Sequence, residues 1–138
     1  MKRELPDGFE LDDDPDRIQL DAVHAFLSGE AYWAVGRPRE TIERLVREAS
    51  RVVGLYRDGA QVGFSRTVSD GMSFAYLADV YVLEEHRGRG LGRALVESAV
   101  NGDPQLAPLR WMLHTRDMHP LYRQFGFVEP DDRFLERK

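Results

Sequence analysis

The stretch at residues 87–93, Arg-Gly-Arg-Gly-Leu-Gly-Arg, is the most informative part of this sequence. It follows a strand-like run that ends near Leu83 and opens a helix-like pattern over residues 90–100. Glycines allow positive φ angles and a close backbone approach to a ligand, and the first turn of a helix offers free N–H groups. The stretch therefore predicts an anion site with phosphate as its natural guest, although composition alone would favour a solvated loop.

Two common phosphate motifs do not fit this loop. The dinucleotide fingerprint requires a further Gly or Ala where this chain has Arg93, and an early β-α-β unit that is not expected here. The P-loop requires a Gly-Lys-Ser/Thr ending, which is absent. By elimination, the sequence predicts a different phosphorylated ligand.

The remaining pattern predicts a mixed, mostly antiparallel sheet flanked by helices, an α+β fold. Helical spacing of apolar residues and runs of β-prone residues alternate along the chain. Pro38 is expected in the first turn of the second helix. The expected strands are 9–11, 52–57, 61–68, 74–83, 110–115 and a last one from 127, and the expected helices are 19–28, 38–49, 90–100 and 120–125.

Composition narrows the possible classes of function. The 138 residues fit a single domain over 1–138, and the absence of cysteine excludes a disulfide scaffold and a thiol nucleophile. The net charge of −5 argues against nucleic-acid binding. We expect no membrane span, no signal peptide, no metal site among the four scattered histidines, and a cytoplasmic location.

A second motif makes the assignment specific. The Arg-x-x-Gly-x-Gly pattern of the loop, with Arg87, Gly90 and Gly92 in its fixed positions, resembles the acetyl-CoA signature of the GNAT superfamily. Residues 121–127, Leu-Tyr-Arg-Gln-Phe-Gly-Phe, resemble a second element of that family at the matching distance. The resemblance covers nearly the whole chain. Segments 32–38, 79–82 and 115–119 are further similar to a bacterial GNAT subgroup whose members are mostly uncharacterised.

The resemblance implies an N-acetyltransferase that moves an acetyl group from acetyl-CoA, its co-substrate, to a primary amine by direct attack in a ternary complex. It implies that the cofactor lies between splayed strands 74–83 and 110–115, with its pantetheine arm bonding the backbone of the first. The acceptor would be a small-molecule or peptide amine, and a homodimer is possible. The residues that this implies for cofactor binding are Val80, Tyr81, Val82, Arg87, Gly88, Arg89, Gly90, Leu91, Gly92 and Arg93.

Two residues are candidates for the chemistry. Tyr122 matches a family tyrosine that protonates the departing thiolate, and otherwise would be a core residue beside Phe125 and Phe127. Asp79 lies inside an apolar strand, where a buried carboxylate is costly unless it is paired or has a function. It could act as a base, anchor the substrate ammonium, or form an ion pair with an arginine such as Arg66.

The loop between the first two helices is the candidate acceptor site. Tyr32, Trp33 and Arg37 could hold a substrate with an apolar part and a carboxylate, or the aromatic residues could simply anchor the loop. Glu84, Glu85, His86 and His119 are weaker candidates for chemistry, and each is more often a solvated loop residue. Asp117 is expected to cap the last helix.

Two other functions remain open. A non-catalytic acyl-CoA-binding module would keep the glycine loop but would not need Tyr122. A nucleotide-binding regulatory domain is disfavoured by the missing last glycine of its fingerprint. The sequence leaves open whether the acceptor is an amino acid, a polyamine, an aminoglycoside, a peptide or a protein lysine.

Overall fold

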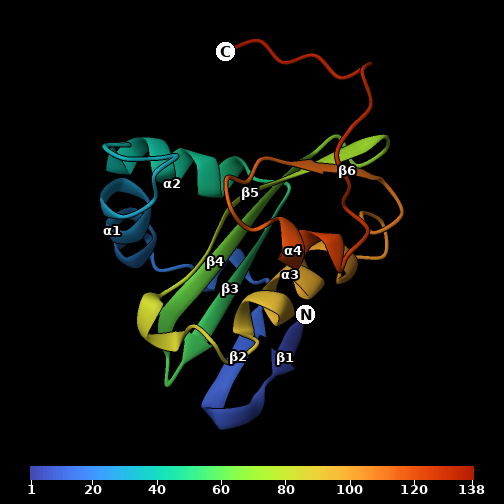
Figure 1. The fold of residues 1–138 in the computed structure, drawn as a ribbon. Coiled ribbons are helices and arrows are strands. Elements are labelled where there is room, and N and C mark those ends of the chain that lie inside the picture. The colour runs from blue at the N-terminus through green and yellow to red at the C-terminus, as the bar shows by residue number, and fades with distance from the viewer.

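The computed structural model describes all residues, 1–138, and contains one six-stranded sheet in the order β1-β2-β3-β4-β5-β6 (Figure 1). The first five strands are antiparallel to their neighbours, and β6 is parallel to β5. The strands are β1 (Lys2–Glu4), β2 (Phe9–Asp12), β3 (Arg51–Arg57), β4 (Ala60–Ser69), β5 (Phe74–Val82) and β6 (Arg110–Leu113). The helices are α1 (Leu20–Gly29), α2 (Arg39–Glu48), α3 (Leu91–Asn101) and α4 (His119–Arg123).

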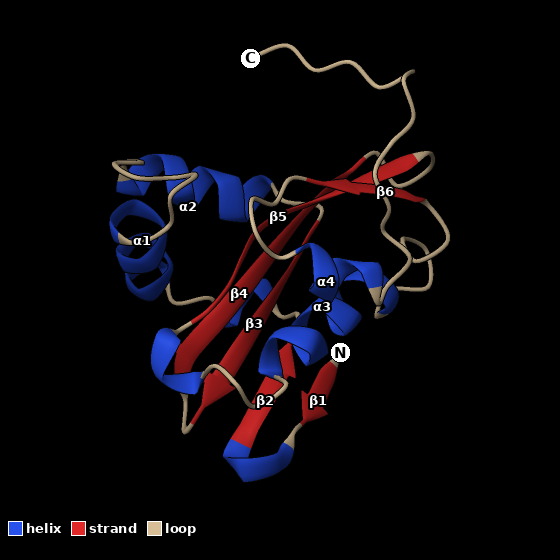
Figure 2. Ribbon diagram, in the orientation of Figure 1, coloured by secondary structure: helices blue, strands red, loops and turns tan.

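The helices cover the two faces of the sheet. Helices α1 and α2 lie on one side, and α3 and α4 on the other (Figures 1 and 2). On the first side Phe26 and Ile42 pack against Phe64, and on the second Leu95 and Val96 lie fully buried against the strands. None of the helices has the length and apolar character that crossing a bilayer would require.

Strands β5 and β6 stay together only over their first four residues. Their register runs from Phe74 opposite Arg110 to Leu77 opposite Leu113, where β6 ends. Strand β5 continues to Val82 and has no neighbour on this edge beyond Leu77. The sheet therefore opens between these strands, directly before the glycine loop.

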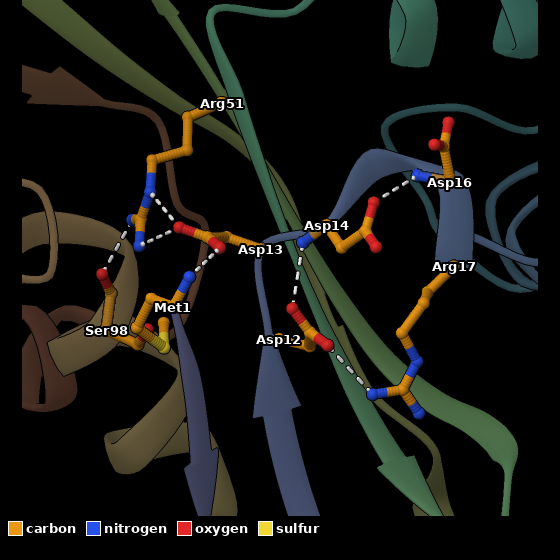
Figure 3. A network of polar contacts seen from close by, with 8 residues as sticks. All are labelled: Met1, Asp12, Asp13, Asp14, Asp16, Arg17, Arg51 and Ser98. Carbon is orange, nitrogen blue, oxygen red and sulfur yellow. Dashed lines mark hydrogen bonds and ion pairs between the residues drawn. The ribbon is translucent and has the colours of Figure 1, made fainter.

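The acidic residues near the start of the chain form ion pairs that connect several strands and a helix (Figure 3). Asp13 accepts hydrogen bonds from the N-terminal ammonium of Met1 at 2.6 Å and from Arg51 Nη2 at 3.3 Å. Arg51 in turn donates from Nη1 to the carbonyl oxygen of Ser98 at 2.7 Å, near the C-terminal end of α3. Asp12 accepts from Arg17 Nη1 at 2.9 Å. The network thus ties β1, β2, β3 and α3 together.

The mixed sheet with flanking helices is confirmed, with differences at its margins. Strand β1 was not expected, because Lys2–Glu4 is short, polar and exposed and forms only by pairing with β2. The last strand expected at Phe127 is wrong. Gly126 adopts a φ of +87° and Val128 is 78% exposed, so the chain leaves the sheet after α4.

The expected cap of α4 is also wrong. The N-terminal residue preceding this helix is Met118, and it receives its support from Thr115, whose Oγ1 accepts from the Met118 backbone N–H at 3.1 Å. Asp117 makes no capping bond. Pro38 likewise lies one residue before α2 rather than inside its first turn.

Candidate functional site

A β-bulge in β5 shapes the centre of the site. Phe64 pairs with Tyr81 and Arg66 with Ala78, so β5 has one residue more than β4 across this interval. Asp79 adopts a φ of +54°, which is uncommon for a residue other than glycine. Leu77 consequently packs against α3, whereas Tyr81, four residues later, stacks on Phe26 of α1 at 4.0 Å between ring centres. An uninterrupted strand would point both side chains to the same face.

The bulge turns the carboxylate of Asp79 toward α1 and α2, where it accepts from three side chains. Arg66 Nε donates to it at 2.8 Å, Trp33 Nε1 at 2.8 Å, and Arg37 Nη1 at 3.2 and 3.3 Å to its two oxygens. The Asp79 side chain is only 3% exposed. Burial alone would raise the pKa of this carboxyl, but the charge and hydrogen bond of Arg66, with Trp33 and Arg37, hold it below its ordinary value. The carboxylate is therefore ionised and already bonded.

The loop between α1 and α2 is fixed next to Asp79 by contacts of two neighbouring aromatic residues, Trp33 and Tyr32. Trp33 contacts Asp79, and the Trp33 ring meets the ring of Tyr32 edge-on at 5.0 Å. The hydroxyl of Tyr32 accepts from the backbone N–H of Arg116 at 3.0 Å, and the guanidinium of Arg116 lies 3.9 Å above the Tyr32 ring. The predicted acceptor residues are thus brought next to both Asp79 and the connection between β6 and α4.

The glycine loop presents an unusual run of free donors. Gly88 and Gly90 adopt φ values of +81° and +77°, and Gly90 directly precedes α3. All six backbone N–H groups from Gly88 to Arg93 lack a hydrogen-bond partner within the chain. A Cβ on Gly88, Gly90 or Gly92 would meet no atom within 4 Å, so open space lies before the loop. This geometry can receive an anion.

The three arginines of the loop have different surroundings. Arg87 donates from Nε to the carbonyl oxygen of Val82 at 2.9 Å and so fixes the loop to the end of β5. Arg93 donates to the side chain of Gln124 at 2.9 Å and joins α3 to the segment after α4. Arg89 lies 5.9 Å from the ring of Phe9. All three arginines belong to the loop or to the first turn of α3, and they add positive charge to this part of the chain.

Tyr122 lies on the other side of the opening, in α4. It is 8% exposed and packs with Leu77 of β5 and Val96 of α3. Burial, with a contribution from the nearby Tyr32, raises the pKa of Tyr122 to about 12. The same ring borders a cavity of about 850 Å³ that extends along β6. The phenol is therefore both packed in the core and placed at a cavity wall.

One polar group at the site was missed by sequence reasoning. His114 follows β6, and its two ring nitrogens contact the hydroxyl of Tyr76 and the carboxylate of Glu136. Strand alternation could have placed His114 on the same face as Met112, whose register partner is Tyr76. No local signal could have found Glu136, because it lies 22 residues further along in an irregular segment.

Comparison with known proteins agrees with this arrangement. The sequence model described as "Acetyltransferase (GNAT) domain" matches residues 48–129. A candidate acetyltransferase of Gibberella zeae is 35% identical, over 84% of this chain and 77% of that protein.

Solved structures with a similar fold are also acetyltransferases by their descriptions. The crystal structure of a candidate GNAT-family acetyltransferase from Xanthomonas campestris pv. campestris has a TM-score of 0.88 and 36% identity, covering 94% of this chain and 92% of the other. One from Deinococcus radiodurans shares the fold, with a TM-score of 0.76 at 24% identity over 99% and 94% of the two chains. From its glycine loop, its opened sheet and these relatives, the chain is an acetyltransferase that belongs to the GNAT family.

Proposed function

We propose that this acetyltransferase moves an acetyl group from acetyl-CoA to a primary amine, by direct attack while both substrates are bound. The observation that carries the proposal is the run of six free N–H groups before and at the start of α3, which lies next to the opening between β5 and β6. The pyrophosphate of acetyl-CoA suits these donors and the three arginines. The pantetheine arm suits the unpaired edge of β5 near Val80–Val82, because it can add like a strand.

The chemistry requires three things from the chain. Backbone N–H groups at the opening polarise the thioester carbonyl. Tyr122 donates a proton to the departing sulfur, and its pKa of about 12 keeps the phenol protonated at neutral pH. The amine attacks directly, which agrees with a chain that has no cysteine nucleophile.

The acceptor is proposed to be an amine with an apolar part and a carboxylate. Tyr32 and Trp33 are 46% and 40% exposed and can cover the apolar part. Arg37 and Arg66 together carry two positive charges against one carboxylate, Asp79, so a positive charge remains for an anionic group. In this proposal Asp79 holds the loop in place and does not act as the base, because its carboxylate is ionised and bonded to three donors.

The first test is calorimetric titration with acetyl-CoA, using Gly90→Val. A Cβ at a φ of +77° both strains the loop and intrudes on the space before it, so we expect affinity to fall at least about tenfold. The matched control is Gly59→Val, in the hairpin between β3 and β4, where φ is +81° and a Cβ also meets open space. The control should lose comparable stability and keep its affinity. Unchanged affinity in folded Gly90→Val would exclude the loop as the site.

Turnover is measured by release of the CoA thiol with a panel of amines. The panel contains L-phenylalanine, phenethylamine, L-leucine, isopentylamine, spermidine, glucosamine and a lysine peptide. The two amino acids should be better acceptors than the amines that lack their carboxylate. Binding of acetyl-CoA without turnover on any amine would favour the non-catalytic acyl-CoA-binding alternative, and tighter binding of NAD or ATP would favour a nucleotide-binding domain.

The role of Tyr122 has its own test. Tyr122→Phe keeps the ring and its packing, so the melting temperature and acetyl-CoA affinity should remain. A thiol has an ordinary pKa of about 8.5, so its thiolate leaves fairly well unaided. We therefore expect kcat to fall by roughly 10–10²-fold, the low end for general acid catalysis. A normal kcat would remove Tyr122 from the chemistry, and a large loss of melting temperature would make it a core residue.

A further inference from the structure

Three side chains from separate parts of the chain form a line of polar contacts. The hydroxyl of Tyr76 in β5 contacts Nδ1 of His114, which follows β6, and Nε2 of His114 contacts the carboxylate of Glu136 near the C-terminus. Residues that are 60 positions apart in the sequence, Tyr76 and Glu136, are thereby linked through one imidazole. Such an arrangement fixes the tautomer of the neutral ring, with Nδ1 accepting and Nε2 donating.

This line lies on the acceptor side of the sheet. Tyr76 precedes Leu77, which packs against α3, so its side chain points to the opposite face, where Arg37 and Asp79 lie. Asp79 is three residues further along β5, about 10 Å along the strand. The charge of Arg66 lowers the pKa of the Tyr76 phenol and the charge of Asp79 raises it.

The reaction needs a proton acceptor that the groups assigned so far do not provide. An alkylammonium has an ordinary pKa of about 10.4 and must lose a proton before its nitrogen can attack the thioester. Asp79 is ionised, but its oxygens are bonded to Arg66, Trp33 and Arg37. Tyr122 lies on the α3 side of the sheet and is needed in its protonated form.

We propose that Tyr76, His114 and Glu136 form a proton relay that takes the proton released by the acceptor amine. This inference rests on the proposed function. Tyr76 is the catalytic residue of the relay, since its oxygen takes the proton from the acceptor nitrogen. His114 stores the proton, and Glu136 is a positioning residue that holds the ring.

The proton balance is simple. The acceptor binds as an ammonium and gives one proton to the oxygen of Tyr76, which frees the lone pair that attacks the thioester carbonyl. The second proton that the nitrogen loses as the amide forms balances the one that Tyr122 gives to the departing sulfur. The hydroxyl proton of Tyr76 moves to Nδ1 of His114, so the phenol ends as it began. The imidazolium so formed keeps its Nε2–H on the carboxylate of Glu136. The His114 side chain is 57% exposed and can pass the extra proton to water.

The surrounding groups are compatible with this role. Burial, helped by the charge of Glu136, raises the pKa of Tyr76, so the phenol stays protonated until the relay operates. Arg66 opposes this shift and Asp79 adds to it. The other charged or titratable residues along the cavity beside β6 are Arg110, His119, Tyr122, Arg123, Glu129 and Asp131. Of these, Arg123 pairs with Glu129, and Asp131 with Arg133.

The decisive experiment is the pH profile of kcat/KM for His114→Gln, with the panel amine that wild type acetylates fastest. Wild-type kcat/KM should rise at a pH well below the pKa of the free amine, because the relay removes the proton from the bound amine. In His114→Gln the rise should move toward the pKa of the free amine. The variant should therefore lose at least about tenfold at pH 7 and recover most of this loss at pH 9.5.

Two further variants and one control complete the test. Tyr76→Phe should show the same displaced profile, and Glu136→Gln a smaller loss of the same kind. His24→Gln, a substitution in α1 outside this line, should leave the profile unchanged. In every variant the acetyl-CoA affinity and the melting temperature should match wild type.

The outcomes separate this inference from the proposed function. If wild type acetylates no amine in the panel, the proposed function fails first. If wild type is active and His114→Gln keeps the wild-type profile, or is reduced equally at every pH, the relay is wrong while the transferase stands. Nitrogen-15 spectra of the imidazole give a readout without an acceptor. The Nδ1 signal of the neutral ring should show an accepted hydrogen bond in wild type and should shift in Tyr76→Phe, and an unchanged Nδ1 signal would contradict the contact.

Discussion

Asp13 and Asp79 are both held by guanidinium groups, yet the two regions use their charges differently. Around Asp13, the N-terminal ammonium and Arg51 meet one carboxylate, and Arg17 is shared between the neighbouring Asp12 and Glu10. These contacts join β1, β2, β3 and α3 (Figure 3). Around Asp79, Arg37 and Arg66 share one buried carboxylate at a strained position in β5.

The two regions differ in how many arginine N–H donors remain free once the carboxylate is paired. In the N-terminal network Arg51 has few free donors left, because it also donates to the carbonyl oxygens of Ser98 and Ala99 at the end of α3. In the Asp79 network Arg37 reaches the carboxylate with Nη1 alone, at 3.2–3.3 Å, and keeps its other donors. The first arrangement suits stability, and the second suits a site that must still bind an anion.

Arg51→Met should give the largest loss of stability. The Arg51 side chain is 6% exposed, and its removal takes one cation from Asp13 and one hydrogen-bond donor from each of two carbonyls at the end of α3. We expect the free energy of unfolding to fall by about 3 kcal/mol in urea denaturation. Arg44→Met, which breaks an exposed pair with Glu48 in α2, is the control and should change little. A loss of acetyl-CoA affinity in folded Arg51→Met would contradict the purely structural role.

Asp79→Asn should cost less stability, about 2 kcal/mol at pH 7, because the amide oxygen still accepts while the ion pairs are lost. The pKa of Asp79 is lowered in the folded protein, so its stabilisation is complete above the ordinary value of about 3.9 and is lost as pH falls through the lower folded value.

The stability gap between wild type and Asp79→Asn should therefore be constant between pH 5 and 7 and shrink below pH 4. Asp58→Asn is a matched control, since Asp58 also has a positive φ, of +51°, but lies in a hairpin turn. A gap that does not depend on pH would show that the loss comes from packing and not from the ionised carboxylate.

Arg37→Gln should have the smallest effect on stability, under about 1 kcal/mol, since its bonds to Asp79 are long and its side chain is 22% exposed. Its effect should fall on the acceptor instead. We expect KM for L-phenylalanine to rise several-fold and KM for phenethylamine to stay the same. Arg39→Gln, in the first turn of α2, is the control. Equal losses for both acceptors would place Arg37 with Arg51 as a structural residue.

The elements that the sequence predicted well are those with a strong local signal. Helix α2 has its apolar residues at helical spacing, and the turn at Asp58 and Gly59 predicted the hairpin between β3 and β4. The elements that were missed or wrong depend on a partner. Strand β1 forms because β2 offers an edge, and Phe127 and Val128 stay irregular although both residue types are prone to form a strand.

The sequence by itself determined the family and the position of the glycine loop, because glycine spacing and helix start are local properties that the chain carries into any context. It also indicated that Asp79 needed a partner, since a carboxylate in an apolar strand must be paired. Only the tertiary structure decided that the bulge turns Asp79 toward Trp33 and Arg37, and that His114 meets both Tyr76 and Glu136. These contacts join residues far apart in the chain, and one extra residue in β5 reverses the face to which the following side chains point.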